Sequence, residues 1–315
     1  MKNKVFKLAG VSAVAICAIA STKAEATESA FGRYTPGIFA TPGVGYVPPT
    51  PGVYWQSSSF YYHGSASKDL RVPVAGSVQL GFESNYFSQT FTGLWVPELE
   101  LGHNLSLAFS LSLPVQHLRA SVDTRRFGIS DSAGGLGDII FGPILGWRSD
   151  SGTTFASASL RIFAPTGSYD SDAIANIGTN YWTFSPNLSF TTINPENGLE
   201  FDLTAGIDFN TRNTATDYTS GALAHVDAAV IQNFNKQFGI GIFGSALYQL
   251  QDDKGPLADR LDGFKGRSFA VGPVLKYTGG TEERPISVSL SWAPEFGVKN
   301  RMRGDAFYLN IAGKF

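Results

Sequence analysis

The chain has 315 residues, 43% hydrophobic and 13% aromatic, with 35 glycines, a mean hydropathy of −0.02 and a formal net charge of −2. A pI near 6.1 without a basic cluster argues against nucleic-acid binding. Beyond residue 26, no stretch approaches the roughly 18 apolar residues that a membrane-spanning helix needs. Such weak hydropathy is compatible with a transmembrane β-barrel, because only every second residue of its strands faces lipid.

The first 26 residues have the pattern of a secretory signal peptide. Three lysines precede an apolar run over residues 8–20, which is too short to span a bilayer as a helix. Small residues predict cleavage after Ala24 or Ala26, and the alternative is a buried hydrophobic helix. The single cysteine, Cys17, lies inside this segment, so the mature chain is expected to depend on no disulfide.

Residues 27–52 form a segment rich in proline and glycine. Its Pro36-Gly37, Pro42-Gly43 and Pro51-Gly52 pairs exclude a helix or a central strand. The aromatic side chains between these pairs favour packing against a partner surface. We therefore expect a plug or gate at the periplasmic mouth of a barrel, and the alternative is a disordered leader.

Residues 53–315 alternate between apolar and polar side chains with the period of β-strands. In the clearest case, 201–209, Phe201, Leu203 and Ile207 share one face while Asp202 and Asp208 share the other. The pattern predicts an all-β fold, a transmembrane antiparallel barrel of about twelve strands, with about ten to fourteen as the range. The strands are expected near 53–63, 86–98, 104–117, 136–149, 152–164, 181–192, 201–209, 222–234, 236–251, 267–278, 285–293 and 304–315, and 77–84 is either a further strand or part of a loop.

The connections between these strands are short and long in turn. Short ones are expected near 99–103, 150–151, 194–197, 235 and 279–284, and long ones near 64–85, 120–135, 165–180, 210–221, 252–266 and 296–303. Short periplasmic turns alternating with long extracellular loops are typical of outer-membrane barrels, whereas a soluble β-sandwich has no reason to keep this order. The pattern predicts the outer membrane of a Gram-negative bacterium, reached through the periplasm. Lipid, lipopolysaccharide and the assembly machinery that reads the terminal Phe315 are the expected partners.

The polar face of each strand is expected to line the lumen, since an Arg or Lys facing lipid at mid-membrane costs about 2–4 kcal/mol. This places ten candidates on a lumen or substrate path: Asp138, Arg148, Arg161, Tyr181, Asn187, Asp202, Asp208, His225, Asp227 and Lys276. Two interpretations stay open. The charges are either an ion-pair network that packs a narrow barrel or the lining of a solute path.

Catalysis has little support in the sequence. Only four histidines are present, and His225 with Asp227 is the one pairing that shares a lumen-facing strand side. The acidic stretches 170–172 and 252–262 lack the pattern of a calcium loop. Gly134 to Asp138 is interpreted as the entry of a strand and not as a phosphate loop. We expect no enzyme activity, cofactor or metal.

Several runs carry a family resemblance. They are Pro165 to Tyr169, Asn176 to Trp182, Phe209-Asn210, Asn213, Thr216 to Tyr218, Ser220-Gly221, Gly266-Arg267, Ala270, Gly272-Pro273, Glu295-Phe296 and Asn300-Arg301. In this order and spacing, the chain from about 50 to 315 resembles the outer-membrane protein family linked with the meta-pathway of phenol degradation. The resemblance implies an outer-membrane transporter of hydrophobic or aromatic compounds and supplies no catalytic residues.

The motif residues themselves are candidates for loop function. They are Tyr169, Asn176, Asn180, Trp182, Asn210, Asp217, Tyr218, Arg267, Glu295 and Arg301. Tyr181, Trp182 and Tyr218 are placed where an aromatic girdle is expected. Gly167, Gly178, Gly221 and Gly266 are expected at loop–strand junctions, where a positive φ or tight turning is useful.

The favoured function is a porin-like channel for passive uptake of small hydrophobic or aromatic compounds. A barrel enzyme acting on lipids, with His225 and Asp227 as its residues, is one alternative. A closed structural barrel, whose lumen charges fill its interior, is the other.

Overall fold

A computed structural model describes residues 32–66, 71–74, 77–102, 104–123, 128–260, 265–281 and 283–315. The predicted signal peptide, the first residues of the Pro/Gly-rich segment and His103 lie outside the described residues.

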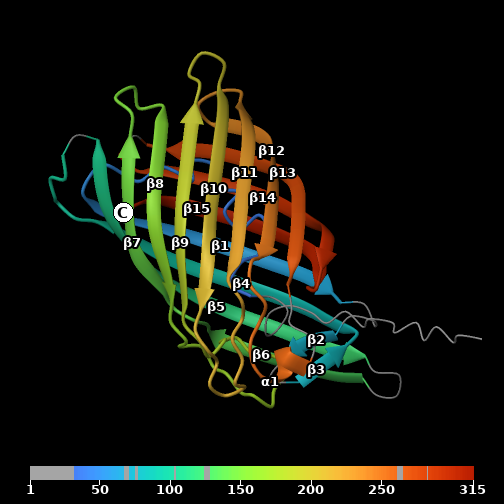
Figure 1. The fold of residues 1–315 in the computed structure, drawn as a ribbon. Coiled ribbons are helices and arrows are strands. Elements are labelled where there is room, and N and C mark those ends of the chain that lie inside the picture. Colours follow the sequence, from blue (N-terminus) through green and yellow to red (C-terminus); the bar gives the residue numbers. More distant parts are fainter. Residues whose placement is uncertain are drawn as a thin grey trace, which may run out of the picture.

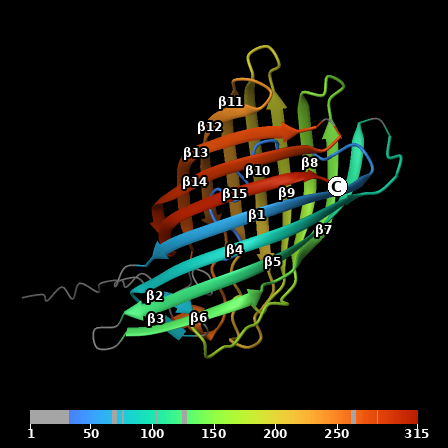
Figure 2. The same cartoon turned by 180° about the vertical axis from the view of Figure 1, so that it is seen from behind.

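Twelve antiparallel strands close into one barrel, as Figures 1 and 2 show from opposite sides. They are β1 (Gly52–Ser65), β4 (Phe82–Val96), β5 (Leu105–Asp123), β7 (Ile140–Arg148), β8 (Thr154–Phe163), β9 (Thr183–Ile193), β10 (Leu199–Asn210), β11 (Leu223–Asn233), β12 (Phe238–Gln249), β13 (Arg267–Gly280), β14 (Pro285–Lys299) and β15 (Arg303–Lys314). β1 pairs with both β15 and β4, and the pairing of β4 with β5 closes the circle. The predicted twelve-strand barrel is confirmed.

Three further strands and a helix lie outside the barrel circle. β6 (Gly128–Leu136) pairs with β5, and β2 (Arg71–Val74) with β3 (Ser77–Leu80) forms a separate hairpin. The helix α1 (Pro256–Arg260) lies in a loop at the same end of the barrel as this hairpin (Figure 1). Among the described residues, no helix is long and apolar enough to cross a membrane.

Two of the predictions of long loops are wrong. Residues 120–135 were expected as a loop, but β5 continues to Asp123 and β6 covers 128–136. The region near 296–303 is a link of only three residues between β14 and β15. Gly297 has a φ of 60°, and the β13–β14 register shifts between Arg267 and Phe269, so the alternation breaks while the strand continues.

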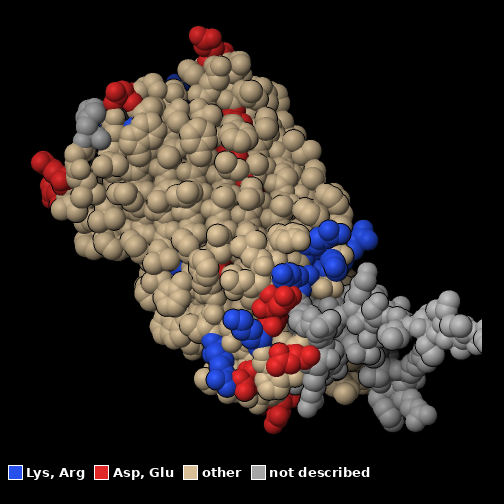
Figure 3. All heavy atoms as spheres, in the orientation of Figure 1, with Lys and Arg blue, Asp and Glu red and all other residues tan. Residues whose placement is uncertain are grey.

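The strand faces separate by polarity. On β10, Phe201 is exposed on the outer surface whereas Asp202 is buried inside. The outer surface carries stacked aromatic pairs such as Trp95 with Phe109 and Trp292 with Phe307. In Figure 3 the wall is largely free of charge, and most of the charged side chains gather toward the end with the long loops. These features are those of a barrel whose outer face contacts lipid.

Candidate functional site: a filled lumen and a loop in the barrel wall

The barrel wall is interrupted beside β5. One edge of β5 pairs with β7 over Leu105–Ser112 and with β6 over Val115–Asp123. β6 and β7 thus follow one line, broken at residues 137–139. The predicted strand entry at Gly134 to Asp138 is wrong, because β6 ends there and the chain leaves the ladder.

A loop takes the place of a strand in this part of the wall. β8 ends at Phe163, which pairs with Ile140, and β9 begins at Thr183. Residues 164–182, here called the wall loop, connect them, and no described strand pairs with the second edge of β6. The Ala175 amide donates to the Asp131 carboxylate of β6 at 3.2 Å. The wall loop therefore lies beside β6 and is bonded to it through the Asp131 side chain, without a ladder.

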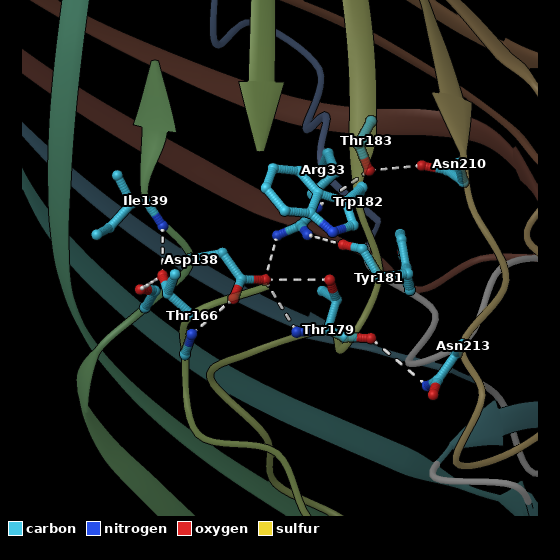
Figure 4. A network of polar contacts seen from close by, with 12 residues as sticks. Arg33, Asp138, Ile139, Thr166, Thr179, Tyr181, Trp182, Thr183, Asn210 and Asn213 are labelled. Atoms are coloured by element: carbon cyan, nitrogen blue, oxygen red, sulfur yellow. Dashed lines mark hydrogen bonds and ion pairs between the residues drawn. The ribbon is translucent and has the colours of Figure 1, made fainter. Parts of the chain in front are cut away.

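Asp138 joins the wall loop to the broken strand (Figure 4). Its carboxylate accepts from the Gly167 amide at 2.7 Å and from the Thr179 amide and hydroxyl at 3.0 and 3.1 Å. The Ile139 amide donates to the Thr166 hydroxyl at 2.9 Å. Both ends of the wall loop are thus held at the point where β6 and β7 separate.

Arg33 reaches Asp138 from inside the barrel. Its guanidinium lies 2.6 Å from the Asp138 carboxylate, and both side chains are almost fully buried. It also donates to the Tyr181 carbonyl at 2.9 Å and to the Thr183 hydroxyl at 3.3 Å, and it lies over the Phe163 ring. Arg33 was not predicted as a lumen residue, because its segment lacks the alternation that shows which way a strand residue points.

Two glycines bring the ends of the wall loop into backbone contact. A Cβ atom on Gly178 would lie 2.3 Å from the Gly167 carbonyl oxygen. Neither residue has a positive φ, nor has Gly221 or Gly266, so that part of the expectation is wrong. For Gly167 and Gly178 the requirement is close approach of two backbones.

The neighbouring loop, residues 211–222, braces the wall loop from the side. The Asn213 amide group donates to the Tyr169 hydroxyl at 3.0 Å and accepts from Asn180 at 2.8 Å. Asn180 and Asp217 adopt a positive φ, which Asn and Asp tolerate better than most residues. Inside the wall loop, Asn176 donates to the carbonyls of Asp170 and Ala173.

Tyr181 and Tyr218 do not form the expected girdle, because both are buried, whereas Trp182 is exposed. The Tyr218 hydroxyl donates to the Asp253 carboxylate, which also accepts from the Gly221 amide at 2.6 Å. The predicted acidic loop thus uses Asp253 to hold neighbouring backbone.

Residues 32–50, here called the lumen segment, run inside the barrel. From the level of Asp138, the segment passes Asp227 and Ser245, whose side chains both accept from the Gly37 amide at 3.0 Å. It then reaches Asp202, which accepts from the Gly43 amide at 3.1 Å, and ends where β1 begins. The segment therefore follows the length of the lumen and is not confined to the periplasmic mouth.

The middle of the lumen is closed by aromatic packing. The Tyr34 and His225 rings stack with centroids 4.2 Å apart, and Phe39 packs on His225 at 5.3 Å. The Tyr34 hydroxyl donates to Asp227 at 2.8 Å and contacts the Ser245 hydroxyl at 2.7 Å. The Arg161 guanidinium lies 3.9 Å from the Phe39 ring centroid.

His225 and Asp227 do not form a catalytic pair. The Asp227 carboxylate is occupied by Tyr34 and Gly37, and neither His225 ring nitrogen has a hydrogen-bond partner among the described residues. The Asp208 carboxylate lies 3.6 Å from His225 Nε2. The His225 ring packs against Tyr34 and Phe39, and no hydroxyl of the described residues is hydrogen-bonded to it.

Two further charge clusters line the lumen. Lys276 pairs with Glu200 at 2.5 Å, and the Thr191 hydroxyl donates to Asp202 at 2.5 Å. Glu295 accepts from three donors, the hydroxyls of Tyr62 and Ser268 and the Gly304 amide. Nearby, Arg301 donates to the Tyr34 carbonyl at 3.3 Å. Burial lowers the pKa of Arg301, and the Glu295 carboxylate opposes that shift.

The remaining predicted residues differ in their location. Asn187 and Asp208 are buried in the lumen, and Asn210 accepts from the Thr183 hydroxyl at 2.7 Å. Arg148 and Arg267 are exposed, and Asp217 pairs with Arg212 at the surface. The partners that the sequence did not single out include Thr183, Thr191, Glu200 and Ser245. Their polar side chains on the inner strand faces were the only available signal.

An apolar groove of about 680 Å³ lies on the outer wall just below the wall loop. Pro143, Leu160 and Pro186 line it, on three adjacent strands. The β7–β8 pairing skips Gly142 and Pro143, and the β9–β10 pairing skips Ser185 and Pro186. A proline has no N–H to donate, so the ladder is weakened twice at this height.

Known proteins show the same fold. The chain is similar over 87% of its length to an outer membrane channel from Pseudomonas putida F1, of which it covers 99%, with a TM-score of 0.70 and 15% identity. It is also similar over 84% of its length to the beta domain of the Bordetella autotransporter Brka, of which it covers 100%, with a TM-score of 0.50 and 9% identity. No curated protein matches the sequence. At these identities the likeness is one of fold.

The family follows from the sequence match. A model of the family described as "Putative MetA-pathway of phenol degradation" matches residues 67–311, which is most of the chain and extends from the residues before β2 into β15. The earlier resemblance is confirmed: the chain belongs to this phenol-degradation family.

Proposed function

We propose that this protein is an outer-membrane channel for passive passage of small hydrophobic or aromatic compounds, which leave the barrel sideways through the wall loop. One observation carries the proposal. The lumen segment fills the barrel along its length, whereas the wall beside β6 is closed by a loop that Asp138 holds in place.

Physical chemistry favours a sideways route for such solutes. A path along the lumen would lead an apolar molecule past Asp227, Asp202 and the Lys276–Glu200 pair. A path through the wall leads instead to the apolar groove lined by Leu160, where an apolar solute meets lipid without crossing water. The similar channel from Pseudomonas putida supports a transport function, and the family name supports aromatic compounds as solutes.

The site favours passage of a solute without a chemical reaction. The described residues contain no group of three or more metal-ligating side chains, and His225 in the lumen packs against the Tyr34 and Phe39 rings. Among the described residues, no hydroxyl group is hydrogen-bonded to the His225 ring, so a serine–histidine arrangement is not formed there. We therefore propose a channel and not an enzyme.

A closed structural barrel is the second candidate, and the filled lumen favours it. Flux into liposomes separates the two functions. Refolded protein in liposomes should pass phenol- or toluene-like solutes faster than sugars of similar size, relative to empty liposomes. No flux of either class above empty liposomes would exclude the channel and leave the closed barrel.

A further inference from the structure

Three basic side chains lie together on the outer wall, at the end of the barrel that carries the long loops. Arg267 begins β13, Lys299 ends β14 and Arg303 begins β15, and all three are exposed. Arg267 pairs directly with Lys299 in the sheet register, so their side chains share a face. Only three residues separate Lys299 from Arg303 across the tight link. Figure 3 shows Lys and Arg gathered at this end of the barrel.

Nearer the middle of the membrane, the outer faces of the same three strands are apolar. Phe269 and Phe296 pack with ring centroids 5.9 Å apart, and Trp292 stacks on Phe307 at 6.2 Å. Below the basic side chains, the rings of Trp292, Phe296 and Phe307 are exposed on the outer wall, and the Phe269 ring is half-buried. The surface therefore offers positive charge at the membrane boundary and an aromatic face directly beneath it.

The carboxylates near this cluster leave positive charge available. Asp305 accepts from the Trp292 indole at 2.9 Å, and Asp252 lies 3.6 Å from Lys265. Arg303 donates its Nε to the Glu295 carbonyl at 3.2 Å, which fixes the guanidinium without neutralising it. Among the described residues, neither Arg267 nor Lys299 makes an ion pair.

We propose that Arg267, Lys299 and Arg303 bind a phosphate group of lipopolysaccharide, with its acyl chains lying on the Phe269–Phe296 and Trp292–Phe307 pairs. Guanidinium and ammonium groups are the common partners of phosphate, and an arginine can bind it through two parallel hydrogen bonds. The proposal rests on placement of the long loops on the outer surface of the outer membrane. It does not depend on which solutes cross the barrel, so a failed flux experiment leaves it standing.

The test uses full-length mature protein refolded from denaturant, which carries no bound lipid. Native mass spectrometry in detergent would measure binding of diphosphoryl lipid A, of the same lipid without phosphates, and of phosphatidylglycerol. The test variant is Arg267→Gln/Lys299→Gln/Arg303→Gln. The control, Lys236→Gln/Arg284→Gln, removes two exposed charges from the turns at the opposite end. A charge-conserving variant, Arg267→Lys/Arg303→Lys, checks that a loss of binding reflects charge and not misfolding.

The expected result is at least an approximately tenfold weaker binding of diphosphoryl lipid A by the triple variant, because each basic group near a lipid surface adds to affinity. The control should bind within about threefold of the wild type, and the charge-conserving variant should bind diphosphoryl lipid A more tightly than the triple variant does. Equal binding by the triple variant and the wild type would overturn the site. Equal binding of lipid A with and without phosphates would overturn phosphate recognition. Phosphatidylglycerol bound as tightly as lipid A would overturn the assignment to lipopolysaccharide.

Discussion

Arg33 and Asp138 meet inside the barrel at 2.6 Å, although they lie 105 positions apart in the chain. One belongs to the lumen segment and the other to the break between β6 and β7. Because Asp138 also holds Gly167 and Thr179, a displacement of either the lumen segment or the wall loop is felt by the other. The pair therefore couples the interior of the barrel to its wall.

The first prediction concerns this pair. Asp138→Ala should destabilise the barrel by about 3 kcal/mol, since it leaves Arg33 buried without its partner charge. It should also speed hydrogen exchange at the Gly167 and Thr179 amides. Arg33→Ala should leave those two amides protected, because Asp138 still accepts from them. Equal exchange in the two variants would contradict the role given to Asp138.

A second prediction concerns the lumen segment. Deleting residues 33–46 removes the peptide that fills the lumen, so the single-channel conductance in planar bilayers should rise well above that of the wild type. The deletion spares β1, whose strand begins at Gly52, and the retention of heat-dependent gel mobility would check folding. An unchanged conductance would mean that side chains of the wall close the barrel by themselves.

The third prediction tests the close approach of the wall-loop ends. Gly178→Ala should cost about 1–3 kcal/mol, because its methyl group would collide with the Gly167 backbone. Gly244→Ala is the matched control, since nothing lies within 4 Å of its Cβ position. Urea unfolding of the two variants measures the difference. Similar midpoints for both would show that the wall loop relaxes freely around position 178.

A fourth prediction concerns the buried charges near the short-turn end. Lys276→Met should destabilise the protein by about 3 kcal/mol, because the fully buried Glu200 carboxylate then lacks its counter-charge. Adding Glu200→Gln should recover much of that loss, since the amide carries no charge and still accepts from Asn233. A double variant as unstable as the sum of the two single variants would show that the pair is not coupled.

A strand could be predicted where its two faces differ clearly in polarity. Residues 201–209 were predicted as a strand and β10 spans Leu199–Asn210, because lipid and lumen impose opposite demands on alternate residues. β6 was missed, since Ser130, Ser132 and Gly134 leave one of its faces without a continuous apolar row. Because β6 pairs with only one strand and lies beside the wall loop, it does not need a continuous apolar row.

The inner strand residues were predictable by the same period, but their partners were not. Asp138, Asp202 and Asp227 were placed in the lumen from sequence alone. Arg33, Tyr34 and the Gly37 amide, which satisfy two of these carboxylates, come from a segment without periodicity. Its course is set by tertiary contacts with side chains of distant strands, and no local pattern encodes those contacts.

Tethering the wall loop to β6 tests the central claim most directly. In Asp131→Cys/Ala175→Cys, a short reducible thiol cross-linker would join two positions whose side-chain and backbone atoms lie 3.2 Å apart. Asn104→Cys/Asp150→Cys places the same tether at the opposite end of the barrel. We predict that cross-linking the first pair stops the flux of phenol-like solutes into liposomes, that reduction restores it, and that the control tether has no effect. Unchanged aromatic flux through the tethered wall would contradict a sideways route.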